Sequence, residues 1–424
     1  MSRFSVFFLY FLAVFLQAGA YGLTFMLPRL FESFGANEKV VGLMLGVTAV
    51  CTVVTVYFSG HLSDIFGRLR TLACACVAIS AALVLYGNVS TVGVWLVLAS
   101  VLLGFGWGLT YSLGPIVLTR LVGVDDRVRY FSLLSVFVMA GFGLSPVLAS
   151  VLEGLGYSIR DAFLLTGALC LVSALLFFML DAPIKAHALG QRTEAPSRIT
   201  RAALRGVVRS KAVLPVTMVC LGASVFAGLN NFQTVFADAR GLDYASFFLT
   251  YTVTVVVCRL MLARFKGGAN PYRTIALLQY VMSLSIVLFI FSSSSVPLYL
   301  LVAVLFGVGY GVSYPILVAM TANDVDEDLS AQTLQVFALT YFIGIFGFPL
   351  IAGWMIVEVG AVPLLWLVAI MAVIEAPLPC ALRRAVALGG QAVVIVSTFW
   401  RRGIENDAVV RLISDYPKYQ LIDS

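Results

Sequence analysis

Charged residues are scarce in this chain of 424 residues: Lys, Arg, Asp and Glu together make up 11% of it, while hydrophobic residues make up 61%. A water-soluble protein needs roughly a quarter of its residues charged to cover its surface. Without that charge, a soluble fold would expose a large apolar patch and aggregate. The composition therefore argues against a water-soluble domain and predicts an exterior that faces lipid.

The sequence also lacks the residue patterns of a metal, cofactor or nucleic-acid site. Its seven cysteines are scattered without metal-ligand spacing, and His61 and His187 lie in polar connections. The sequence contains no Gly-x-x-x-x-Gly-Lys-Ser/Thr loop, the motif that binds nucleotide phosphates, and no basic domain of the kind that contacts nucleic acids. No cluster of His, Asp and Ser suggests catalysis. We therefore expect that the protein is not an enzyme and that it binds no metal, cofactor or nucleic acid.

The chain consists largely of long apolar runs joined by short polar connections. Runs of about 17–25 residues are long enough to cross the hydrocarbon core of a bilayer as helices. They lack the alternation of barrel strands, and backbone groups in lipid must be bonded within a helix or a closed barrel. The sequence therefore predicts an all-α membrane protein with 12 transmembrane helices, near residues 5–33, 40–60, 71–88, 93–119, 130–153, 161–181, 213–236, 245–264, 274–293, 296–320, 331–357 and 361–380.

Lys and Arg are distributed unequally between the two sets of connections. One set carries Arg68, Arg70 and the basic stretch 185–211, whereas the other carries few such residues. Because Lys and Arg concentrate in cytoplasmic loops, we expect both termini in the cytoplasm and a multi-pass protein of the inner or plasma membrane. The lipid bilayer is then its first partner, and a monomer is expected. A cleaved signal peptide ending near residue 20 would delete the counterpart of the seventh run, which argues against it.

The chain repeats itself at a constant offset of 203 positions. Residues 101–111 (VLLGFGWGLTY) align with 304–314 (VLFGVGYGVSY), and the same offset pairs Gly141 with Gly344. Self-similarity of this length indicates a duplication. Two equivalent bundles in one orientation predict a shared site at the membrane midplane. The predicted domains are an N-terminal six-helix bundle (1–181), a cytoplasmic linker (182–212), a C-terminal six-helix bundle (213–381) and a cytoplasmic tail (382–424).

The connection between the second and third predicted helices carries a specific motif. It reads GHLSDIFGRLR from residue 60 to residue 70, and it resembles the G-x-L-x-D-x-x-G-R-x-R signature of the major facilitator superfamily at every fixed position. The six-plus-six helices and the central linker extend this resemblance over essentially the whole chain. It implies secondary transport by alternating access. In that family the loop latches the two bundles together on the cytoplasmic side, so the predicted conformational latch consists of Gly60, Asp64, Gly67, Arg68 and Arg70.

These latch residues also have a physical role that does not depend on the resemblance. Gly60 would let a neighbouring helix approach, and Gly67 would permit a tight turn. Asp64 places a negative charge at the membrane edge, where it can accept hydrogen bonds from a helix N-terminus or an arginine. The acidic pair 125–126 offers a partner for Arg68. A merely topological basic loop would explain the arginines, but neither Asp64 nor the glycines.

The fifth predicted helix holds Gly141 and Pro146 in the stretch GFGLSPVLAS. This stretch looks like a weakened version of the Gly-Pro motif that the family's exporters carry in that helix, with Ser145 in place of a glycine. Small residues there allow close helix contact and proline allows a kink. The motif favours export over import. Ser100 stands where the family's proton-coupled exporters often have Arg, which counts against a buried proton relay.

Few charged residues lie inside the predicted helices, where charge is costly and usually functional. Arg259 could contact substrate, pair across the bundle or extend to the inner headgroups. Arg29 and Glu32, at the outer end of the first helix, could serve an entrance or a rim salt bridge. Glu375 precedes Ala-Pro as Asp181 does and is interpreted as a helix end. The candidates for gating or coupling are therefore Arg29, Glu32, Gly141, Pro146 and Arg259.

In this family's architecture the first helix of each three-helix unit lines the substrate pathway. Tyr111 and Tyr314 occupy equivalent repeat positions on two such helices and are expected to face each other. Amides and tyrosines can bind a solute without the desolvation cost of a buried ion, although any one of them could instead bond helices together. The predicted cavity residues are Gln17, Tyr21, Thr24, Trp107, Tyr111, Ser112, Asn230, Asn231, Gln233, Tyr310, Ser313 and Tyr314.

Together these features predict a secondary transporter that exports a small organic or amphipathic solute. A neutral or zwitterionic solute fits better than phosphate or nitrate, which would call for midplane arginines. Proton antiport is the expected coupling, since one charge crossing 100 mV supplies about 2.3 kcal/mol. Two alternatives stay open. One is an importer or facilitator of a sugar, amino-acid-like or chelate solute, and the other is a non-transporting membrane receptor or scaffold of the same fold.

Overall fold

The computed structural model describes residues 2–122, 127–187, 201–262, 271–292, 294–323, 325 and 327–378. The secondary structure of these residues is helical, and they contain no strand. Eleven helices are long and apolar enough to cross a membrane, and a shorter apolar helix spans Ala361–Glu375. The predicted all-α membrane fold is confirmed.

The first bundle contains the helices up to residue 179. The first crossing combines α1 and α2 through a 3₁₀ turn at Leu23–Met26, and the other crossings are single helices. The bounds are α1 Arg3–Gly22, α2 Leu27–Glu32, α3 Glu38–Phe66, α4 Arg68–Asn88, α5 Val94–Leu121, α6 Arg127–Gly154 and α7 Ile159–Met179.

The second bundle begins at residue 213, after two short helices, α8 (Asp181–His187) and α9 (Arg201–Arg209). The predicted tail 382–424 lies outside the described residues, and most of the predicted linker lies outside them or in these short helices. The domain boundaries therefore stay a prediction. The bounds are α10 Val213–Asn230, α11 Gln233–Asp238, α12 Tyr244–Leu262, α13 Pro271–Phe291, α14 Val296–Asn323, α15 Glu327–Phe342, a π-helical segment Ile343–Gly347, α16 Phe348–Glu358 and α17 Ala361–Glu375.

Local sequence signals explain several helix boundaries. The side chain of Asn37 accepts a hydrogen bond from the Val40 backbone at the start of α3, as N-cap residues do. Ser158 and Asp161 form a capping box at the start of α7. Gly67 separates α3 from α4 with a φ of 85°, which only glycine adopts without strain. The predicted tight turn at Gly67 is therefore confirmed.

Three crossings are interrupted where the sequence suggested continuous helices: the first at its 3₁₀ turn, and the seventh and the eleventh. The seventh ends at Asn230 rather than near residue 236, because the side chains of Asn230 and Asn231 donate to carbonyl oxygens of their own helix and compete with its continuation. The eleventh contains the π segment Ile343–Gly347. Such segments often lie at functional sites, and this one faces the central site described below.

The repeat found in the sequence is also present in the helix contacts. A Cβ added to Gly106 of α5 would lie 2.6 Å from the carbonyl oxygen of Ala75 in α4. A Cβ added to Gly309 of α14 would lie 2.9 Å from the carbonyl oxygen of Leu278 in α13. Both contact pairs are related by the offset seen in the sequence, so equivalent glycines pack equivalent helices in the two bundles.

Gly141 performs a similar packing role between α6 and α1. A Cβ at this position would lie 2.5 Å from the carbonyl oxygen of Phe15. Its repeat mate Gly344 packs the π segment against the carbonyl oxygen of Cys220 in α10. The predicted close contact at Gly141 is thus present, and Pro146 lies within α6 five residues further along the chain.

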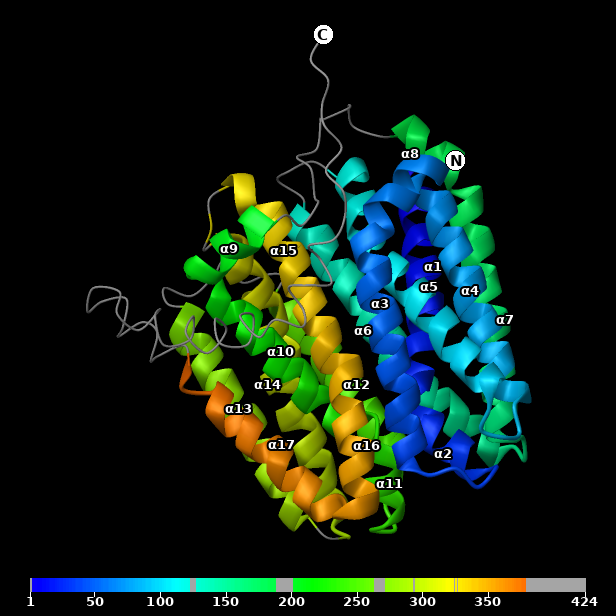
Figure 1. Ribbon diagram of the computed structural model, residues 1–424, viewed down its shortest axis with the longest axis vertical. Coiled ribbons are helices and arrows are strands. Elements are labelled where there is room, and N and C mark those ends of the chain that lie inside the picture. The colour runs from blue at the N-terminus through cyan, green and yellow to red at the C-terminus, as the bar shows by residue number, and fades with distance from the viewer. Residues whose placement is uncertain are drawn as a thin grey trace.

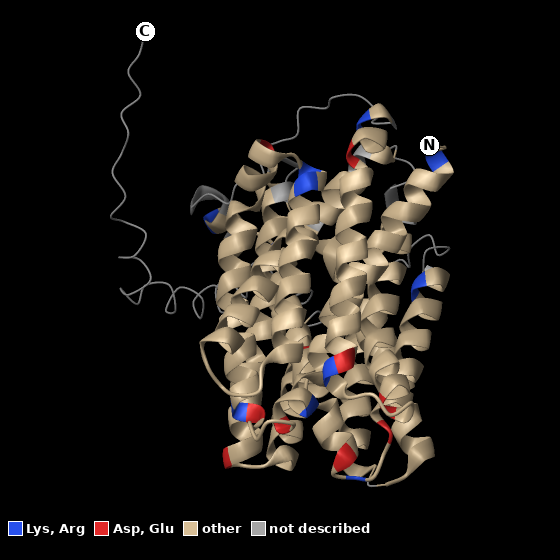
Figure 2. Ribbon diagram, turned by 90° about the vertical axis from the view of Figure 1, so that its right-hand side faces the viewer, with Lys and Arg blue, Asp and Glu red and all other residues tan. Residues whose placement is uncertain are grey.

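The two bundles lie side by side and meet unequally at their two ends (Figure 1). We call the end with the N-terminus and α8 the terminus side, and the end with α2 and α11 the gate side. Along the chain's described part, α3 packs extensively against α16 but sparsely against α15. Lys, Arg, Asp and Glu gather toward the two ends (Figure 2). Because α3 packs on α16 far more than on α15, the bundles are closed against each other at the gate side.

Candidate substrate site and gate

An aromatic cluster lies where the two bundles meet. Tyr21 of α1 stacks on Trp107 of α5 with ring centroids 4.5 Å apart, and Phe142 of α6 lies 4.4 Å from Tyr21. Phe346, from the π segment of the second bundle, contacts the same tyrosine at 5.6 Å. The structure thus brings together two predicted cavity residues, Tyr21 and Trp107. Phe142 and Phe346 were not predicted.

Tyr111 and Tyr314 join the two bundles directly. Their hydroxyl groups form a hydrogen bond, so the predicted facing of these repeat mates is present. Tyr341 of α15 stacks on Tyr111 at 5.5 Å, and Phe342 contacts it edge-on at 4.8 Å. Tyr310 is stacked on Phe226 of α10 at 4.6 Å. The cluster therefore extends from α1 and α5 across the interface into α10, α14 and α15.

Tyr251 of α12 also belongs to this cluster, since its ring lies 6.1 Å from that of Phe226. Three buried polar atoms of the cluster have no hydrogen-bond partner within the described part of the chain: the hydroxyls of Tyr21 and Tyr251 and the indole nitrogen of Trp107. Leaving a buried polar atom unpaired costs about 1–3 kcal/mol, so such exceptions require an explanation. A polar group of a bound solute would provide the missing partners.

Arg259 of α12 lies beside this cluster and is only 4% exposed. Its Nε donates to the Gly311 carbonyl oxygen of α14 at 3.1 Å. One terminal nitrogen donates to the Ser135 carbonyl oxygen of α6 at 3.2 Å and to the Ser135 hydroxyl. Of the roles left open by the sequence, Arg259 adopts pairing across the bundles. Its burial is incompatible with extension to the headgroups.

The remaining predicted cavity residues are more dispersed. Gln17 donates to the Thr110 hydroxyl at 3.1 Å within the first bundle, and Gln233 donates to the Tyr299 hydroxyl at 2.7 Å within the second. Their contact with a solute stays a prediction. Five other predicted cavity residues form side-chain hydrogen bonds to nearby backbone carbonyl groups of their own crossing: Thr24, Ser112, Asn230, Asn231 and Ser313.

An ion-pair network joins the bundles at the gate side. Arg29 of α2 contacts Glu153 of α6 at 3.1 Å and Asp238 of α11 at 2.7 Å. Its guanidinium also lies 4.7 Å from the ring centroid of Tyr244, whose hydroxyl donates to Glu153 at 2.7 Å. Three of these contacts cross between the bundles: Arg29 with Asp238, Arg29 with Tyr244, and Tyr244 with Glu153. Arg29 therefore forms the predicted rim salt bridge, whereas the side chain of Glu32 is exposed and not part of this network.

Direct backbone contact closes the gate side between α3 and α16. A Cβ at Gly42 would overlap the carbonyl oxygen of Pro349, and a Cβ at Gly353 would overlap the carbonyl oxygen of Glu38. These two glycines come from different bundles. Because backbone atoms leave no space at either position, the seal requires glycine on both helices.

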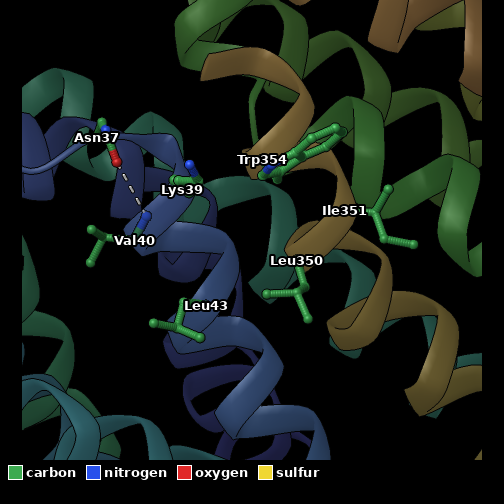
Figure 3. Close-up of a pocket in the computed structure, with 7 residues that line it drawn as sticks. All are labelled: Asn37, Lys39, Val40, Leu43, Leu350, Ile351 and Trp354. Carbon is green, nitrogen blue, oxygen red and sulfur yellow. Dashed lines mark hydrogen bonds between the residues drawn. The ribbon is translucent and has the colours of Figure 1, made fainter. Parts of the chain in front are cut away.

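A groove of about 730 Å³ lies beside this seal (Figure 3). Lys39 at its edge forms an ion pair with Glu358 across the bundles. Four of the five apolar side chains in the groove are about half exposed at the protein surface, and Val40 is partly buried. The groove therefore faces lipid rather than the central cluster. Its apolar lining consists of Val40 and Leu43 from α3 and Leu350, Ile351 and Trp354 from α16.

One physical argument for the latch is wrong in this conformation. An added Cβ at Gly60 would meet no described atom within 4 Å, so no neighbouring helix approaches there, because the bundles separate toward the terminus side. The side chain of Asp64 is exposed. The proposed partners at 125–126 lie outside the described residues. A latch involving Asp64 and Arg68 stays a prediction.

The last latch residue, Arg70, has a partner that the sequence did not identify. Its Nε lies 3.2 Å from Asp181 at the start of α8, and Lys185 contacts the same carboxylate at 2.9 Å. Arg70 lies in the first turn of α4, and Asp181 and Lys185 lie in α8, directly after α7. Arg70 therefore ties the start of the third crossing to the end of the sixth.

Glu375 is a buried carboxylate whose setting the sequence did not reveal. It is the last residue of α17, as the helix-end interpretation requires, but it is 0% exposed. Gln279 of α13 donates to its Oε1 at 2.8 Å, and its Oε2 has no partner among the described residues. Gly222 of α10 packs against the same carboxylate. The sequence signal that could have indicated this buried site is Gln279, a polar residue inside the ninth crossing.

Two helical bundles that share a polar aromatic site, with a gate closed at one end, define a membrane transporter. The sequence profile of the Major Facilitator Superfamily matches residues 6–349, and the chain belongs to this family. The family and the structural neighbours are transporters rather than enzymes.

Two curated relatives show how far sequence similarity extends. An "Uncharacterized MFS-type transporter" of Methanocaldococcus jannaschii is 19% identical over 323 residues, covering 74% of this chain and 81% of the relative. A "Probable 4-methylmuconolactone transporter" of Cupriavidus pinatubonensis is 30% identical over 132 residues, or 31% of this chain and 30% of the relative.

Solved structures agree on the fold. The nucleoside transporter NupG (a mutant form) and a D-xylose-proton symporter each match with a TM-score of 0.67, at 15% and 14% identity. Both matches cover 89% of this chain, and 99% and 97% of the respective structures. The human organic anion transporter MFSD10 matches with a TM-score of 0.65 at 16% identity, covering 89% and 100%.

Proposed function

We propose that this transporter moves a small organic or amphipathic solute by alternating access and exports it in exchange for protons. The observation that carries the proposal is the aromatic cluster between the bundles, with its unpaired hydroxyls of Tyr21 and Tyr251 and the unpaired indole nitrogen of Trp107. A site that offers ring faces and isolated donors suits a solute with a flat apolar body and a few polar groups.

The gate contacts support alternating access. With both termini in the cytoplasm, the gate side faces outward, and the described conformation has its outer end closed. Opening that end requires the Arg29–Asp238 ion pair to break and α3 to leave α16 at Gly42 and Gly353. The opposite end would then close, and Asp64 would come within reach of the other bundle. Both movements follow from one rotation of two rigid bundles about the shared site.

The proposed proton coupling has a candidate residue in Glu375. A carboxylate buried in the membrane is expensive to ionise when no cation pairs with it. Among the described residues none does so, and Gln279 holds the carboxylate on one side only. It packs on α10 at Gly222, and Gly344 of the π segment packs on the same helix. Protonation there could therefore act on the segment that carries Phe346. The fold accommodates proton coupling, since one structural neighbour is named a D-xylose-proton symporter.

The direction rests on the sequence of α6. The stretch from Gly141 to Pro146 resembles the exporters' motif, and Gly141 packs directly on α1. The proposed chemical class of the solute has separate support, since one relative is named a probable 4-methylmuconolactone transporter.

Flux measurements on reconstituted protein test the proposal. Organic solutes that stabilise the purified protein against heat would be followed in proteoliposomes with and without an imposed pH gradient. Tyr21→Phe removes one unpaired hydroxyl and should weaken binding of the selected solute about 3–10-fold, the contribution of one neutral hydrogen bond. Tyr57→Phe, on a side chain that is 64% exposed to lipid, is the matched control.

Three results would contradict parts of the proposal. Equal affinities of the Tyr21 and Tyr57 variants would remove the central cluster as the site. Flux that ignores the pH gradient would remove proton coupling. Solute and protons moving in the same direction would replace export with import.

A further inference from the structure

The charge of Arg259 is not balanced within the part of the chain that the structure describes. Its hydrogen-bond acceptors are two backbone carbonyl groups and one hydroxyl, from Gly311 and Ser135. These groups orient the guanidinium but carry no net negative charge. No described carboxylate pairs with it, and the buried Glu375 is instead bonded to Gln279 of α13.

An unbalanced cation at this depth is costly. Charged side chains inside membrane spans cost several kcal/mol, and they persist where they pair with an opposite charge or serve a pathway. Arg259 cannot reduce this cost by reaching the headgroups, because it is 4% exposed and held between α6 and α14. The remaining way to balance its charge is a mobile anion.

The surroundings of Arg259 restrict the kind of anion. Arg259 donates to the carbonyl oxygen of Gly311, the residue after Tyr310 in α14, and Tyr251 lies about two turns before Arg259 on α12. Tyr310 belongs to a stack with Phe226 and Phe306, at ring distances of 4.6 and 6.0 Å. These surroundings present one positive charge next to aromatic faces. A monoanion with an aromatic body matches both features, whereas a phosphate dianion would leave one of its charges unpaired.

We infer that the transported solute is an organic monoanion, an aromatic carboxylate or sulfonate, whose acidic group binds Arg259. This inference rests on the proposed function and replaces the neutral or zwitterionic solute favoured by the sequence alone. The guanidinium presents a planar fork that bonds carboxylates in two places at once. Because Arg259 also donates to Ser135 of the other bundle, the bound anion would sit at the junction that rearranges when the bundles rotate.

A pair of probes that differ only in charge tests this inference. The probe anion is 1-naphthoate, and its uncharged amide, 1-naphthamide, has nearly the same shape. Binding to the purified full-length protein in detergent would be measured by thermal stabilisation, and exchange by proteoliposome flux. We expect naphthoate to bind at least about 10-fold more tightly than the amide, as a charged hydrogen-bonded pair implies.

Variants assign the charge preference to one residue. Arg259→Gln should abolish the preference for naphthoate while leaving naphthamide binding within about 2-fold. Arg259→Lys keeps the charge and should retain part of the preference, which covers the case in which the glutamine variant does not fold. Arg160→Gln, on a partly exposed arginine at the start of α7, is the control.

The outcomes separate this inference from the proposed function. If naphthamide binds as well as naphthoate, or if Arg259→Gln keeps the preference, the anion inference is overturned while a transporter of neutral solutes stands. If neither probe stabilises the protein nor exchanges, the aromatic site itself is overturned and the inference falls with it.

Discussion

Replacing Gly42 by alanine should open the gate side of this transporter. In the described conformation the position of the new methyl group is occupied by the carbonyl oxygen of Pro349 in α16. A backbone oxygen cannot rotate away as a side chain can, so α3 and α16 must separate. Gly46, one turn further along α3, is the matched control. A methyl group there would meet only side-chain atoms of Leu350, the nearest at 3.6 Å, which is ordinary contact.

The magnitude follows from the cost of overpacking. Forcing one extra methyl group into a filled interface costs about 1–3 kcal/mol. This cost applies only to the conformation in which the gate side is closed. The equilibrium between the two conformations should therefore shift toward the open gate by a factor of about 5–150. The Gly46→Ala variant should shift it by less than about 2-fold.

Thiol labelling from outside measures this shift. Thr24 is 1% exposed and lies behind the gate, so Thr24→Cys in a background without other cysteines should react slowly with a membrane-impermeant maleimide. Adding Gly42→Ala should accelerate labelling by the factor given above, and adding Gly46→Ala should not. Equal rates for all three proteins would show that the α3–α16 contact does not seal the gate.

Three further predictions concern contacts between or within the bundles. Asp238→Asn removes the ion pair of Arg29 with α11; it should favour the open gate by up to about 5-fold, as expected for a partly exposed pair, and an unchanged labelling rate would count against the network. Tyr111→Phe and Tyr314→Phe break the same hydrogen bond, so a double-mutant thermal cycle should show a coupling of about 1 kcal/mol; strictly additive losses would mean that the bond is not formed. Glu375→Gln should keep the melting temperature but lose the drive from a pH gradient, whereas Glu375→Ala should destabilise by about 1–3 kcal/mol; intact pH-driven flux in the glutamine variant would exclude this carboxylate from coupling.

The crossings and the repeat could be predicted because their signals are local or periodic. A long apolar run predicts a membrane helix regardless of its neighbours, and the match of 101–111 with 304–314 predicted that Tyr111 would face Tyr314. The fixed offset carried three-dimensional information, since equivalent residues in a duplicated fold occupy equivalent places. This is why the central tyrosine pair was predicted before the structure was known.

The partners of the charged residues could not be predicted in the same way. Arg29 meets Glu153 and Asp238, which are 124 and 209 positions away, and no periodic pattern connects such distant residues. The sequence also placed Glu375 at a helix end correctly, yet its complete burial depends on how α10, α13 and α17 pack. Such contacts follow from tertiary packing, and the sequence alone restricted them only to a set of alternatives.

The expected helix approach at Gly60 shows a different limit. That prediction named no particular conformation, and the described conformation is closed at the gate side rather than at the terminus side, where Gly60 lies. One sequence has to serve both arrangements of an alternating transporter. A residue that belongs to the arrangement not described here therefore has no visible partner, and its role has to be tested by function.

The ion pairs around Arg29 make the closure of the gate side sensitive to the salt concentration of the surrounding solution. Their side chains are 28–45% exposed on one face of the membrane, so dissolved salt reaches them and weakens their attraction, with a screening length of about 8 Å at 0.15 M. The tyrosine pair at the centre is joined by a hydrogen bond between neutral hydroxyls, which salt does not screen in this way. A saltier compartment on that face would thus loosen the closure at the gate side without disturbing the centre. The ionic strength of a single compartment would then bias how often the solute site faces it.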